Sequence, residues 1–290
     1  MSEPRLVGTR AELTALDRSE AVALVPTMGA LHEGHATLIQ NARAATAGPV
    51  VVSIFVNPLQ FAPGEDLDRY PRTLEADLEV CQEAGADLVF APTVAEIYPQ
   101  GEPQVTVDPG PLGTVLEGES RPTHFRGVLT VVAKLFALVR PDLAFFGEKD
   151  YQQLVLIRRL ALDLCPGVDV IGVPTVRESD GLARSSRNRY LSATERTTAL
   201  ALSRALRAAG ERASYGVPAA RWAAMRVLQE EQGLELDYFA LRDSALAELP
   251  DYPDKPLEGR ALVAARVGTT RLIDNMPIEF PVDFPARGGA

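Results

Sequence analysis

The apolar run Ala21-Val22-Ala23-Leu24-Val25 leads directly into Pro26-Thr27-Met28-Gly29-Ala30-Leu31-His32-Glu33-Gly34-His35. The run reads as a buried strand, and the residues after it read as a turn that opens a helix. His32 and His35 are three residues apart, so both lie on the same face of the first helical turn. The stretch predicts a strand–turn–helix unit whose turn grips an anion such as a phosphate.

The same alternation continues along the chain. Apolar, β-branched runs at Val50–Phe55, Asp87–Phe90, Leu143–Phe146 and Val168–Val173 read as strands. Helix-forming sequence lies between them at 35–45, 73–84, 126–139 and 150–164. Strands that alternate with helices predict an α/β fold, here a Rossmann-like, doubly wound parallel sheet. Ligands of such sheets bind at the carboxyl ends of the strands, where the histidine turn is placed.

The alternation of strand-like and helix-like segments ends between about residues 175 and 185. Ser192–Gly210 is a predicted helix with a capping box of Ser192 and Glu195, and a second helix spans about 218–232. Strand-like runs follow at 236–241, 261–267 and 270–273. We therefore expect a first domain over residues 1–177, for nucleotide and substrate binding, and a smaller C-terminal α+β domain over 178–290.

Composition excludes some classes of function. The 290 residues carry 29 basic and 39 acidic side chains, a net charge of −10, which argues against a nucleic-acid-binding protein. The longest helix-like apolar run, Gly127–Val139, contains Lys134 and is too short for a bilayer, so no membrane span is expected. Cys81 and Cys165 lack metal-ligand spacing, and the first residues lack the pattern of a secretion signal. These features favour a cytoplasmic protein.

The histidine turn has several interpretations. Gly29 and Gly34 would let backbone N–H groups approach a phosphate, and both imidazoles would donate to its oxygens. Alternatively, the two histidines are surface or capping residues, or zinc ligands, although no cysteine or third histidine lies nearby in sequence. The phosphate interpretation is favoured because two of the three histidines of the chain share one glycine-flanked turn.

Three further groups of polar residues follow strand ends or lie in loops. Arg184-Ser185-Ser186-Arg187-Asn188-Arg189 is either an anion-binding loop or an exposed basic loop. In Gly147-Glu148-Lys149-Asp150, Lys149 would reach a phosphate or solvent, and Asp150 would cap the next helix. The amides of Asn57, Gln60 and Gln153 suit a hydroxylated substrate, although each alone is as readily a turn residue.

Together these motifs resemble a known family. The order of five motifs is similar to that of the pantoate–β-alanine ligases, or pantothenate synthetases. These motifs are Pro26-Thr27-Met28-Gly29…His32-Glu33-Gly34-His35, Val56-Asn57-Pro58-Leu59-Gln60-Phe61, Tyr70-Pro71-Arg72-Thr73, Phe146-Gly147-Glu148-Lys149-Asp150-Tyr151-Gln152-Gln153 and Ser185-Ser186-Arg187-Asn188. These are adenylate-forming enzymes of the His-x-Gly-His nucleotidyltransferase group. The resemblance extends to about Ile278.

The resemblance implies a two-step reaction. ATP and pantoate would form pantoyl adenylate with release of pyrophosphate, and β-alanine would then displace AMP to give pantothenate. Within the same group, a nucleotidyltransferase that leaves the nucleotide on its product is an alternative. A nucleotide-binding regulatory protein without turnover is another, although such a relative is expected to have lost His35 or Lys149. An aminoacyl-tRNA synthetase is disfavoured because the acidic chain lacks a basic RNA-binding module.

The resemblance also implies roles for individual residues. His35 would be the catalytic proton donor, supported by His32, with Lys149 and Arg187 at the phosphates. Gln60 and Gln153 would hold pantoate, with Gln60 also bordering β-alanine and Asn57 nearby. The expected ATP-binding residues are Pro26, Thr27, Met28, Gly29, Ala30, Leu31, His32, Glu33, Gly34, His35, Gly147, Glu148, Lys149, Asp150, Val176, Arg184, Ser185, Ser186 and Arg187.

Two expectations rest on the family alone. Mg²⁺ would bridge the phosphates of ATP, with Asp77 as its best-matched protein contact, since Ala76 occupies a position where the family has a carboxylate. A homodimer is also implied. Arg184 departs from the family, which has Met or Leu before Ser-Ser-Arg-Asn, so that the position either contacts a phosphate or points to solvent.

Overall fold

The computed structural model describes residues 3–62, 64–65 and 67–281. The chain divides into two compact units. One comprises Met1–Glu148 and Gln152–Pro174, and the other comprises Lys149–Tyr151 and Thr175–Ala290. The short segment 149–151 therefore belongs to the second unit, although the sequence on both sides of it belongs to the first.

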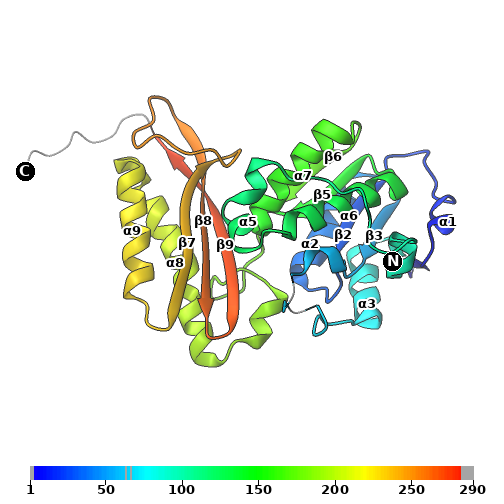
Figure 1. Cartoon of the computed structure of the whole chain (residues 1–290), viewed down its shortest axis with the longest axis horizontal. Helices are drawn as coiled ribbons and strands as arrows, with labels where there is room; N and C mark the ends of the chain where they lie inside the picture. Colours follow the sequence, from blue (N-terminus) through cyan, green and yellow to red (C-terminus); the bar gives the residue numbers. More distant parts are fainter. Residues whose placement is uncertain (1–2, 63, 66, 282–290) are drawn as a thin grey trace, which may run out of the picture. The chain divides into compact units, whose positions relative to one another are not determined.

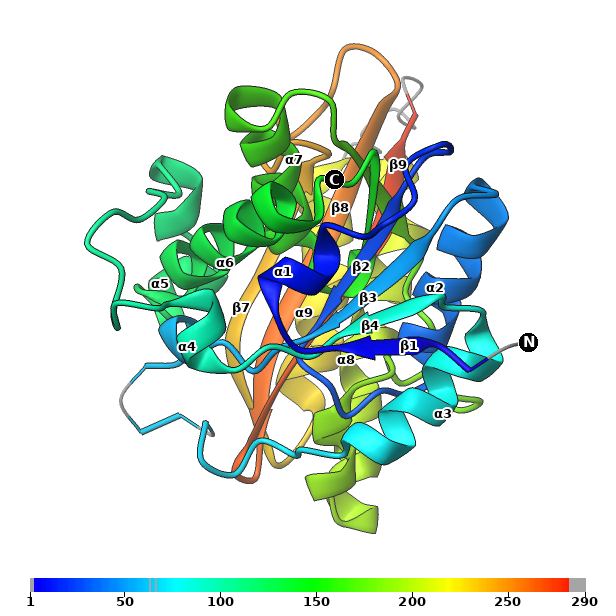
Figure 2. The same ribbon diagram turned by 90° about the vertical axis from the view of Figure 1, so that its right-hand side faces the viewer.

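The first unit is built on a six-stranded parallel sheet in the order β1-β4-β3-β2-β5-β6 (Figures 1 and 2). This architecture confirms the predicted α/β, doubly wound fold. Sequence periodicity does not predict the edge strand β1, because it has only three residues and two of them are exposed. The strands are β1 (Arg5–Val7), β2 (Ala23–Thr27), β3 (Val50–Ile54), β4 (Leu88–Phe90), β5 (Leu143–Gly147) and β6 (Asp169–Val173).

Helices cover both faces of this sheet (Figure 2). On one face, α2 (Glu33–Ala45) and α3 (Leu74–Ala84) bury Ile39 and Cys81 against Val25, Val52 and Phe145 of the strands. On the other face lie α6 (His124–Val139) and α7 (Tyr151–Leu164). The short helices are α1 (Arg10–Leu13), α4 (Val94–Ile97), α5 (Glu117–Ser120), η1 (Pro58–Gln60), η2 (Pro111–Thr114) and η3 (Glu148–Asp150).

The strand order reverses direction at β2. From β2 the chain moves through β3 and β4 toward one edge of the sheet, and β5 and β6 lie on the other side of β2. The pairs that join β2 to β5 are Ala23 with Leu143 and Leu24 with Ala144, which are the first two residues of each strand. The carboxyl ends of β2 and β5 therefore form the switch point at which doubly wound sheets bind ligands.

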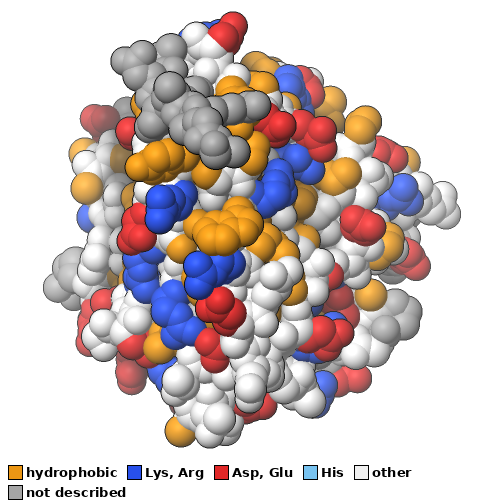
Figure 3. Space-filling view, turned by 90° about the vertical axis from the view of Figure 1, so that its left-hand side faces the viewer, with side chains coloured by type: hydrophobic (Ala, Val, Ile, Leu, Met, Phe, Trp, Pro, Cys, Tyr) orange, Lys and Arg blue, Asp and Glu red, His pale blue; other side chains and the backbone are white. Residues whose placement is uncertain are grey.

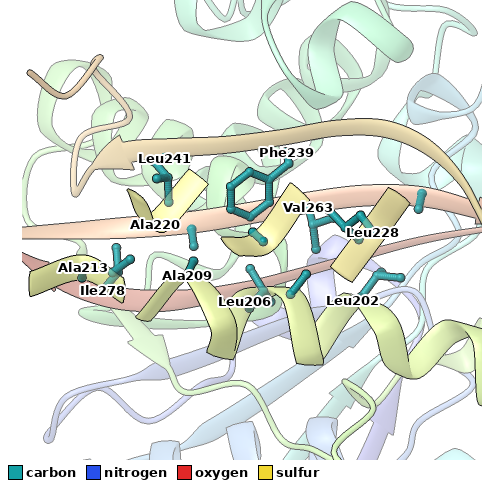
Figure 4. Packing of buried hydrophobic residues seen from close by; sticks show 14 of the residues in the cluster. Leu202, Leu206, Ala209, Ala213, Ala220, Leu228, Phe239, Leu241, Val263 and Ile278 are labelled. Carbon is teal, nitrogen blue, oxygen red and sulfur yellow. The ribbon is translucent and has the colours of Figure 1, made fainter. Parts of the chain in front are cut away.

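The second unit is a three-stranded antiparallel sheet packed against two helices (Figure 1). The helices pack closely because small side chains such as Ala209 and Ala220 face each other, while Leu206 and Phe239 fill the space toward the strands (Figure 4). The predicted capping box of Ser192 and Glu195 is confirmed. The elements are η4 (Ser186–Tyr190), α8 (Ala193–Arg212), η5 (Ala213–Tyr215), α9 (Val217–Glu230), β7 (Leu234–Asp243), β8 (Leu257–Val267) and β9 (Thr270–Phe280).

Hydrophobic side chains gather beside Lys and Arg side chains on the side of the molecule where α9 lies (Figure 3). The exposed aromatic residues of α9 and the segments next to it are Tyr215, Trp222 and Tyr252. Arg226 lies 5.1 Å from the centre of the Trp222 ring, and Arg212 lies 5.5 Å from that of Tyr215. These cation–π contacts cover part of the aromatic surface from within the chain.

No helix in the described ranges combines the length and the apolar character that a membrane crossing requires.

Candidate active site

The histidine turn connects β2 to α2, as the sequence predicts. His32 is the N-cap of α2, and its Nδ1 accepts a hydrogen bond from the backbone N–H of Gly34 at 3.1 Å. The backbone N–H of His32 in turn donates to Nδ1 of His35 at 3.2 Å. The two rings lie 4.1 Å apart between centroids. Because each Nδ1 is an acceptor, the proton of each neutral imidazole is on Nε2.

The backbone of the turn differs from the expectation that its amides approach a phosphate. The N–H of Gly29 donates to Oγ1 of Thr27, those of Ala30 and Leu31 donate to Asp77, and those of His32 and Gly34 donate within the cap. These donors are satisfied by the protein itself. The imidazole side chains and the positive end of α2 are therefore the groups that would hold an anion at this turn, and such binding stays a prediction.

The two glycines of the turn make room for side chains. Gly29 has a φ of +85°, and a Cβ there would lie 3.0 Å from Oδ2 of Asp77 and 3.1 Å from Cγ2 of Ile54. A Cβ on Gly34 would lie 3.0 Å from Cε1 of His32. The glycines thus allow the close approach of a carboxylate on one side of the turn and of an imidazole on the other.

Asp77 anchors this turn from α3. Its carboxylate is buried and accepts the N–H of Leu31 at 2.7 Å and the N–H of Ala30 at 3.1 Å. Ala30 has a left-handed backbone with φ of +53°, which is unfavourable for a residue with a Cβ. The hydrogen bonds to Asp77 therefore hold the turn in a conformation that the local sequence does not favour.

These contacts give no support to Asp77 as a magnesium ligand. Both of its oxygens are already used by backbone donors, whereas Mg²⁺ needs oxygens that are oriented toward the ion. In the described part of the chain, no group of three or more His, Cys, Asp or Glu residues is arranged to hold a metal ion. The role of Asp77 at magnesium stays a prediction.

A buried network surrounds Gln60, the last residue of η1. Nδ2 of Asn57 donates to Oε1 of Gln60 at 3.2 Å and to the carbonyl of Gly127 at 3.1 Å. The hydroxyl of Tyr98 donates to Oδ1 of Asn57 at 2.8 Å. Oε1 of Gln60 is thus used as an acceptor, and its Nε2 donates to Sδ of Met28 in the histidine turn at 2.8 Å. The network connects the motif of Asn57 and Gln60 to the histidine turn, and within it Asn57 orients the amide of Gln60.

No sequence motif points to Tyr98. Its hydroxyl is buried, and burial raises the pKa of the phenol well above its usual value, so that it stays a proton donor at all ordinary pH values. Tyr98 lies at the end of a four-residue helix in a segment without a motif. Only its place beside Asn57 reveals its role.

A second layer holds the backbone of Gln60. Nδ1 of His124 lies 3.0 Å from the carbonyl of Gln60, and Nη2 of Arg121 donates to the same oxygen at 3.3 Å. Arg121 also forms a two-point ion pair with Glu65. Burial opposes the ionised form of Glu65, but the hydrogen bonds and charge of Arg121 outweigh it and hold the pKa of Glu65 below its usual value. The sequence offered a signal for this layer, because His124 is the third histidine of the chain.

The neighbouring glutamines of α7 have different environments. Gln152 is buried, donates to the carbonyls of Leu112 and Val115, and accepts the N–H of Glu117. Gln153 is half-buried, and no hydrogen bond within the described residues holds its amide. The two adjacent amides therefore differ in that only the Gln152 amide is held by the protein, and the contact of Gln153 with pantoate stays a prediction.

In the second unit, Lys149 and Asp150 follow the end of β5. Nζ of Lys149 lies 3.9 Å from Oδ1 of Asp150, and the Lys149 side chain is 20% exposed. Gly147 is the last residue of β5, and Glu148 begins the short η3 helix. The chain thus presents one lysine directly after the carboxyl end of the strand next to β2.

The arginine-rich loop is ordered by one carboxylate. Glu178 accepts from Nδ2 of Asn188 at 2.7 Å and from Nη2 of Arg196 at 2.7 Å, and it lies 3.8 Å from Nη1 of Arg184. Burial alone would raise the pKa of Glu178, but the hydrogen bonds of Asn188 and Arg196 and the nearby arginine charges hold it below its usual value. Arg184, the residue that departs from the family pattern, is thus half-buried beside Glu178 rather than extended into solvent.

Other members of this loop have local backbone contacts. Oγ of Ser185 accepts the N–H of Arg187 at 3.3 Å and caps η4, the short helix that begins at Ser186. The carbonyl of Val176 accepts the N–H of Arg184 at 2.9 Å. The second unit therefore brings Val176 and the residues from Arg184 to Arg187 together. The ligand contacts of these residues stay predictions.

Known proteins are similar to this chain over nearly its full length. The family model for pantoate–β-alanine ligase matches residues 5–277. A pantothenate synthetase of Nocardioides sp. is 60% identical over 98% of this chain and 88% of its own length, and one of Nocardia farcinica is 55% identical over 97% and 87%.

Solved structures agree in fold. The crystal structure of pantothenate synthetase from Thermus thermophilus has a TM-score of 0.87 and 51% identity, covering 94% of this chain and 98% of that one. The ligase from Francisella tularensis, solved with β,γ-ATP and β-alanine, has a TM-score of 0.77 and 33% identity over 94% and 97%. On these grounds the chain belongs to the pantoate–β-alanine ligase family, and it is an enzyme that joins pantoate to β-alanine.

Proposed function

We propose that the chain carries out this ligation in two steps with ATP. A carboxylate oxygen of pantoate attacks the α-phosphorus of ATP, the bond to the β-phosphate breaks, and pyrophosphate leaves. The amine of β-alanine then attacks the acyl carbon of pantoyl adenylate and loses a proton, and the bond from that carbon to the AMP oxygen breaks. The products are pantothenate, AMP and pyrophosphate.

The histidine pair is the observation that carries this proposal. Both Nδ1 atoms accept hydrogen bonds inside the turn, which places the N–H of each neutral imidazole at Nε2, and both rings lie directly after the end of β2. Negative charge grows on the phosphate oxygens as pyrophosphate leaves, and preorganised donors stabilise that charge more than the ground state. His35 supplies a proton or hydrogen bond to the reacting phosphate, and His32 supports it.

Pantoate is held by amides. The network from Tyr98 through Asn57 presents Nε2 of Gln60 as a donor, which suits the carboxylate or hydroxyl oxygens of pantoate. The half-buried amide of Gln153 completes the contact, and Gln60 also borders the position of β-alanine. Asn57 acts mainly by orienting Gln60.

The lysine and arginine motifs hold the nucleotide. Lys149 and Arg187 neutralise the phosphates, Asp150 lies at the ribose, and Val176 contacts the adenine through its backbone. Ser185, Ser186 and Arg184 belong to the loop that closes over the triphosphate. Support for this assignment comes from the motif order and from the solved relative that carries β,γ-ATP and β-alanine.

Magnesium, assembly and location complete the proposal. Mg²⁺ would enter with ATP and would lower the negative charge of its phosphates, with Asp77 as the predicted protein contact. The enzyme works as a homodimer in the cytoplasm, where its two free cysteines stay reduced. The two compact units act as the nucleotide- and pantoate-binding domain and the C-terminal domain.

The test is a substrate-omission assay. Purified protein is incubated with MgATP, pantoate and β-alanine, and AMP, pyrophosphate and pantothenate are measured as each substrate is left out. We expect AMP and pantothenate in equal amounts only with all three present. AMP formation that does not depend on β-alanine, or a nucleotide retained on the product, would contradict the proposal.

A further inference from the structure

The segment that carries Lys149 is attached to the antiparallel sheet of the second unit. The carbonyl oxygen of Lys149 accepts a hydrogen bond of 2.8 Å from Nδ2 of Asn275, which lies 126 residues further along the chain in β9. Lys149–Tyr151 belongs to the second compact unit, whereas the chain on either side of the segment belongs to the first.

The amide of Asn275 has a fixed orientation. Its Oδ1 accepts from Nη1 of Arg260 at 3.1 Å, so its Nδ2 must be the group that faces Lys149. Asn275 is 3% exposed and lies opposite Leu262 in the β8–β9 ladder. Its own carbonyl accepts from Arg177, which also forms a two-point ion pair with Asp274.

Arg260 contacts the same segment through an aromatic ring. Its guanidinium carbon lies 3.9 Å from the centre of the Tyr151 ring, a stacking distance for a cation–π contact. Tyr151 is buried, and its hydroxyl donates to the carbonyl of Ser244 at 2.9 Å. The backbone of Lys149 and the ring of Tyr151 are thus held at two points, while Nζ of Lys149 lies near Asp150.

A buried arginine and a buried asparagine are costly to place in a small antiparallel sheet, since aliphatic residues would pack there without a desolvation penalty. The adjacent positions Ala261, Leu262 and Val263 show that the strand accepts such residues. A role in positioning the backbone of residues 149–151 explains why Arg260 and Asn275 are polar.

We propose that Asn275 and Arg260 are positioning residues for Lys149. They hold the 149–151 segment against the second sheet and thereby set where the ammonium group of Lys149 meets the phosphates of ATP. The proposal rests on the role of Lys149 proposed above. It gives the C-terminal sheet a direct part in the adenylation step.

Asn275→Asp tests the contact with little change of volume. Aspartate keeps an acceptor for Arg260 but replaces the donor by an oxygen that repels the Lys149 carbonyl. We expect the KM for ATP to rise, or the turnover number to fall, by about tenfold, with the KM for pantoate changed less than about twofold. Arg260→Met should show the same pattern. Arg271→Met is the matched control, because Arg271 is also a sheet arginine, four positions before Asn275 in β9, and its ion-pair partner is Asp237 of β7.

A double-mutant cycle with Lys149→Met separates positioning from general stability. If Asn275 acts through Lys149, Asn275→Asp changes the ATP parameters by less than about twofold once Lys149 is absent. An equal fold-change in both backgrounds, or an equal rise of all three KM values, would overturn the positioning role.

The activity of Lys149→Met alone distinguishes the role of Lys149 in ATP binding from the positioning role of Asn275 and Arg260. If Lys149→Met is as active as the unchanged enzyme, the assignment of Lys149 to ATP fails, and the positioning role fails with it. If Lys149→Met is impaired but both sheet variants are not, only the positioning role fails. Should Asn275→Asp not fold, as judged by its thermal transition, the cycle with Arg260→Met decides.

Discussion

The carboxylate of Asp77 in α3 accepts a 2.7 Å hydrogen bond from the backbone N–H of Leu31. Through this contact, and a second one from the N–H of Ala30, a buried residue 42 positions after His35 shapes the turn that carries both histidines. The same carboxylate accepts from Thr73 at 3.2 Å. Asp77 is therefore part of the architecture of the histidine turn.

Asp77→Asn should damage both stability and turnover. The amide retains one acceptor oxygen, so one of the two backbone N–H groups would face an NH₂ group instead. We expect a loss of about 1–3 kcal/mol in the free energy of unfolding, measured by urea titration, together with a lower turnover number. The control Glu75→Gln, on the exposed side of the same helix turn, should change neither.

His35→Ala should lower the turnover number by about 10²–10⁴-fold while the fold survives. The reason is that His35 is half-buried and adds little to the core, whereas its Nε2 is one of the two donors of the turn. Steady-state kinetics and a thermal melt measure the two effects. Thr37→Ala serves as the comparison, because Thr37 is also half-buried in α2 and its hydroxyl donates only to the carbonyl of Glu33. An unchanged turnover number in His35→Ala would remove the catalytic role.

Tyr98→Phe should weaken pantoate binding selectively. Without the hydroxyl, Oδ1 of Asn57 keeps only the 3.4 Å contact with the N–H of Leu59, so the amide of Asn57 holds Gln60 less firmly. We expect the KM for pantoate to rise by about 3–10-fold, from the usual energy of a buried hydrogen bond, and the KM for ATP to stay the same. Tyr215→Phe on the surface is the control, and an equal rise in both KM values would contradict the network.

Gln152 and Gln153 allow a comparison between adjacent residues. Gln153→Ala should raise the KM for pantoate far more than that for ATP, with little effect on stability, because its amide has no partner among the described residues. Gln152→Ala should instead destabilise the fold, by about 1–3 kcal/mol, since it removes the hydrogen bonds of the Gln152 amide to the carbonyls of Leu112 and Val115 and to the N–H of Glu117. If the two variants had the same profile, the division of roles would be wrong.

Stability should fall in alkaline solution because of Cys81. Burial, and secondarily the charge of Asp77, raises the pKa of its thiol from 9.0 to about 12. Above pH 9 the unfolded chain loses this proton while the folded chain retains it, so the stabilising contribution is complete below about 9 and is lost as the pH rises toward 12. Unfolding free energies measured from about pH 7 to 11 should fall more steeply than those of Cys81→Ala, and parallel slopes would contradict the assignment.

Much of the site was predictable because its signals are local. The run Ala21–Val25, the glycines of the turn and the two histidines lie within fifteen consecutive residues, and a strand followed by a helix needs only short-range periodicity to be recognised. The capping box at Ser192 is local in the same way. The amino-acid sequence thus determined the α/β class, the histidine turn and, through the order of its motifs, the resemblance to the ligase family.

Tertiary structure decided how those residues are held. Asp77 meets Leu31 across 46 positions, Tyr98 meets Asn57 across 41, and Asn275 meets Lys149 across 126. No periodic pattern encodes such pairs, since they depend on the order of the strands in the sheet and on which helix covers which face. The physical reason is that a buried hydrogen bond is specified by three-dimensional proximity, whereas a strand, a turn or a helix cap is specified by neighbours along the chain.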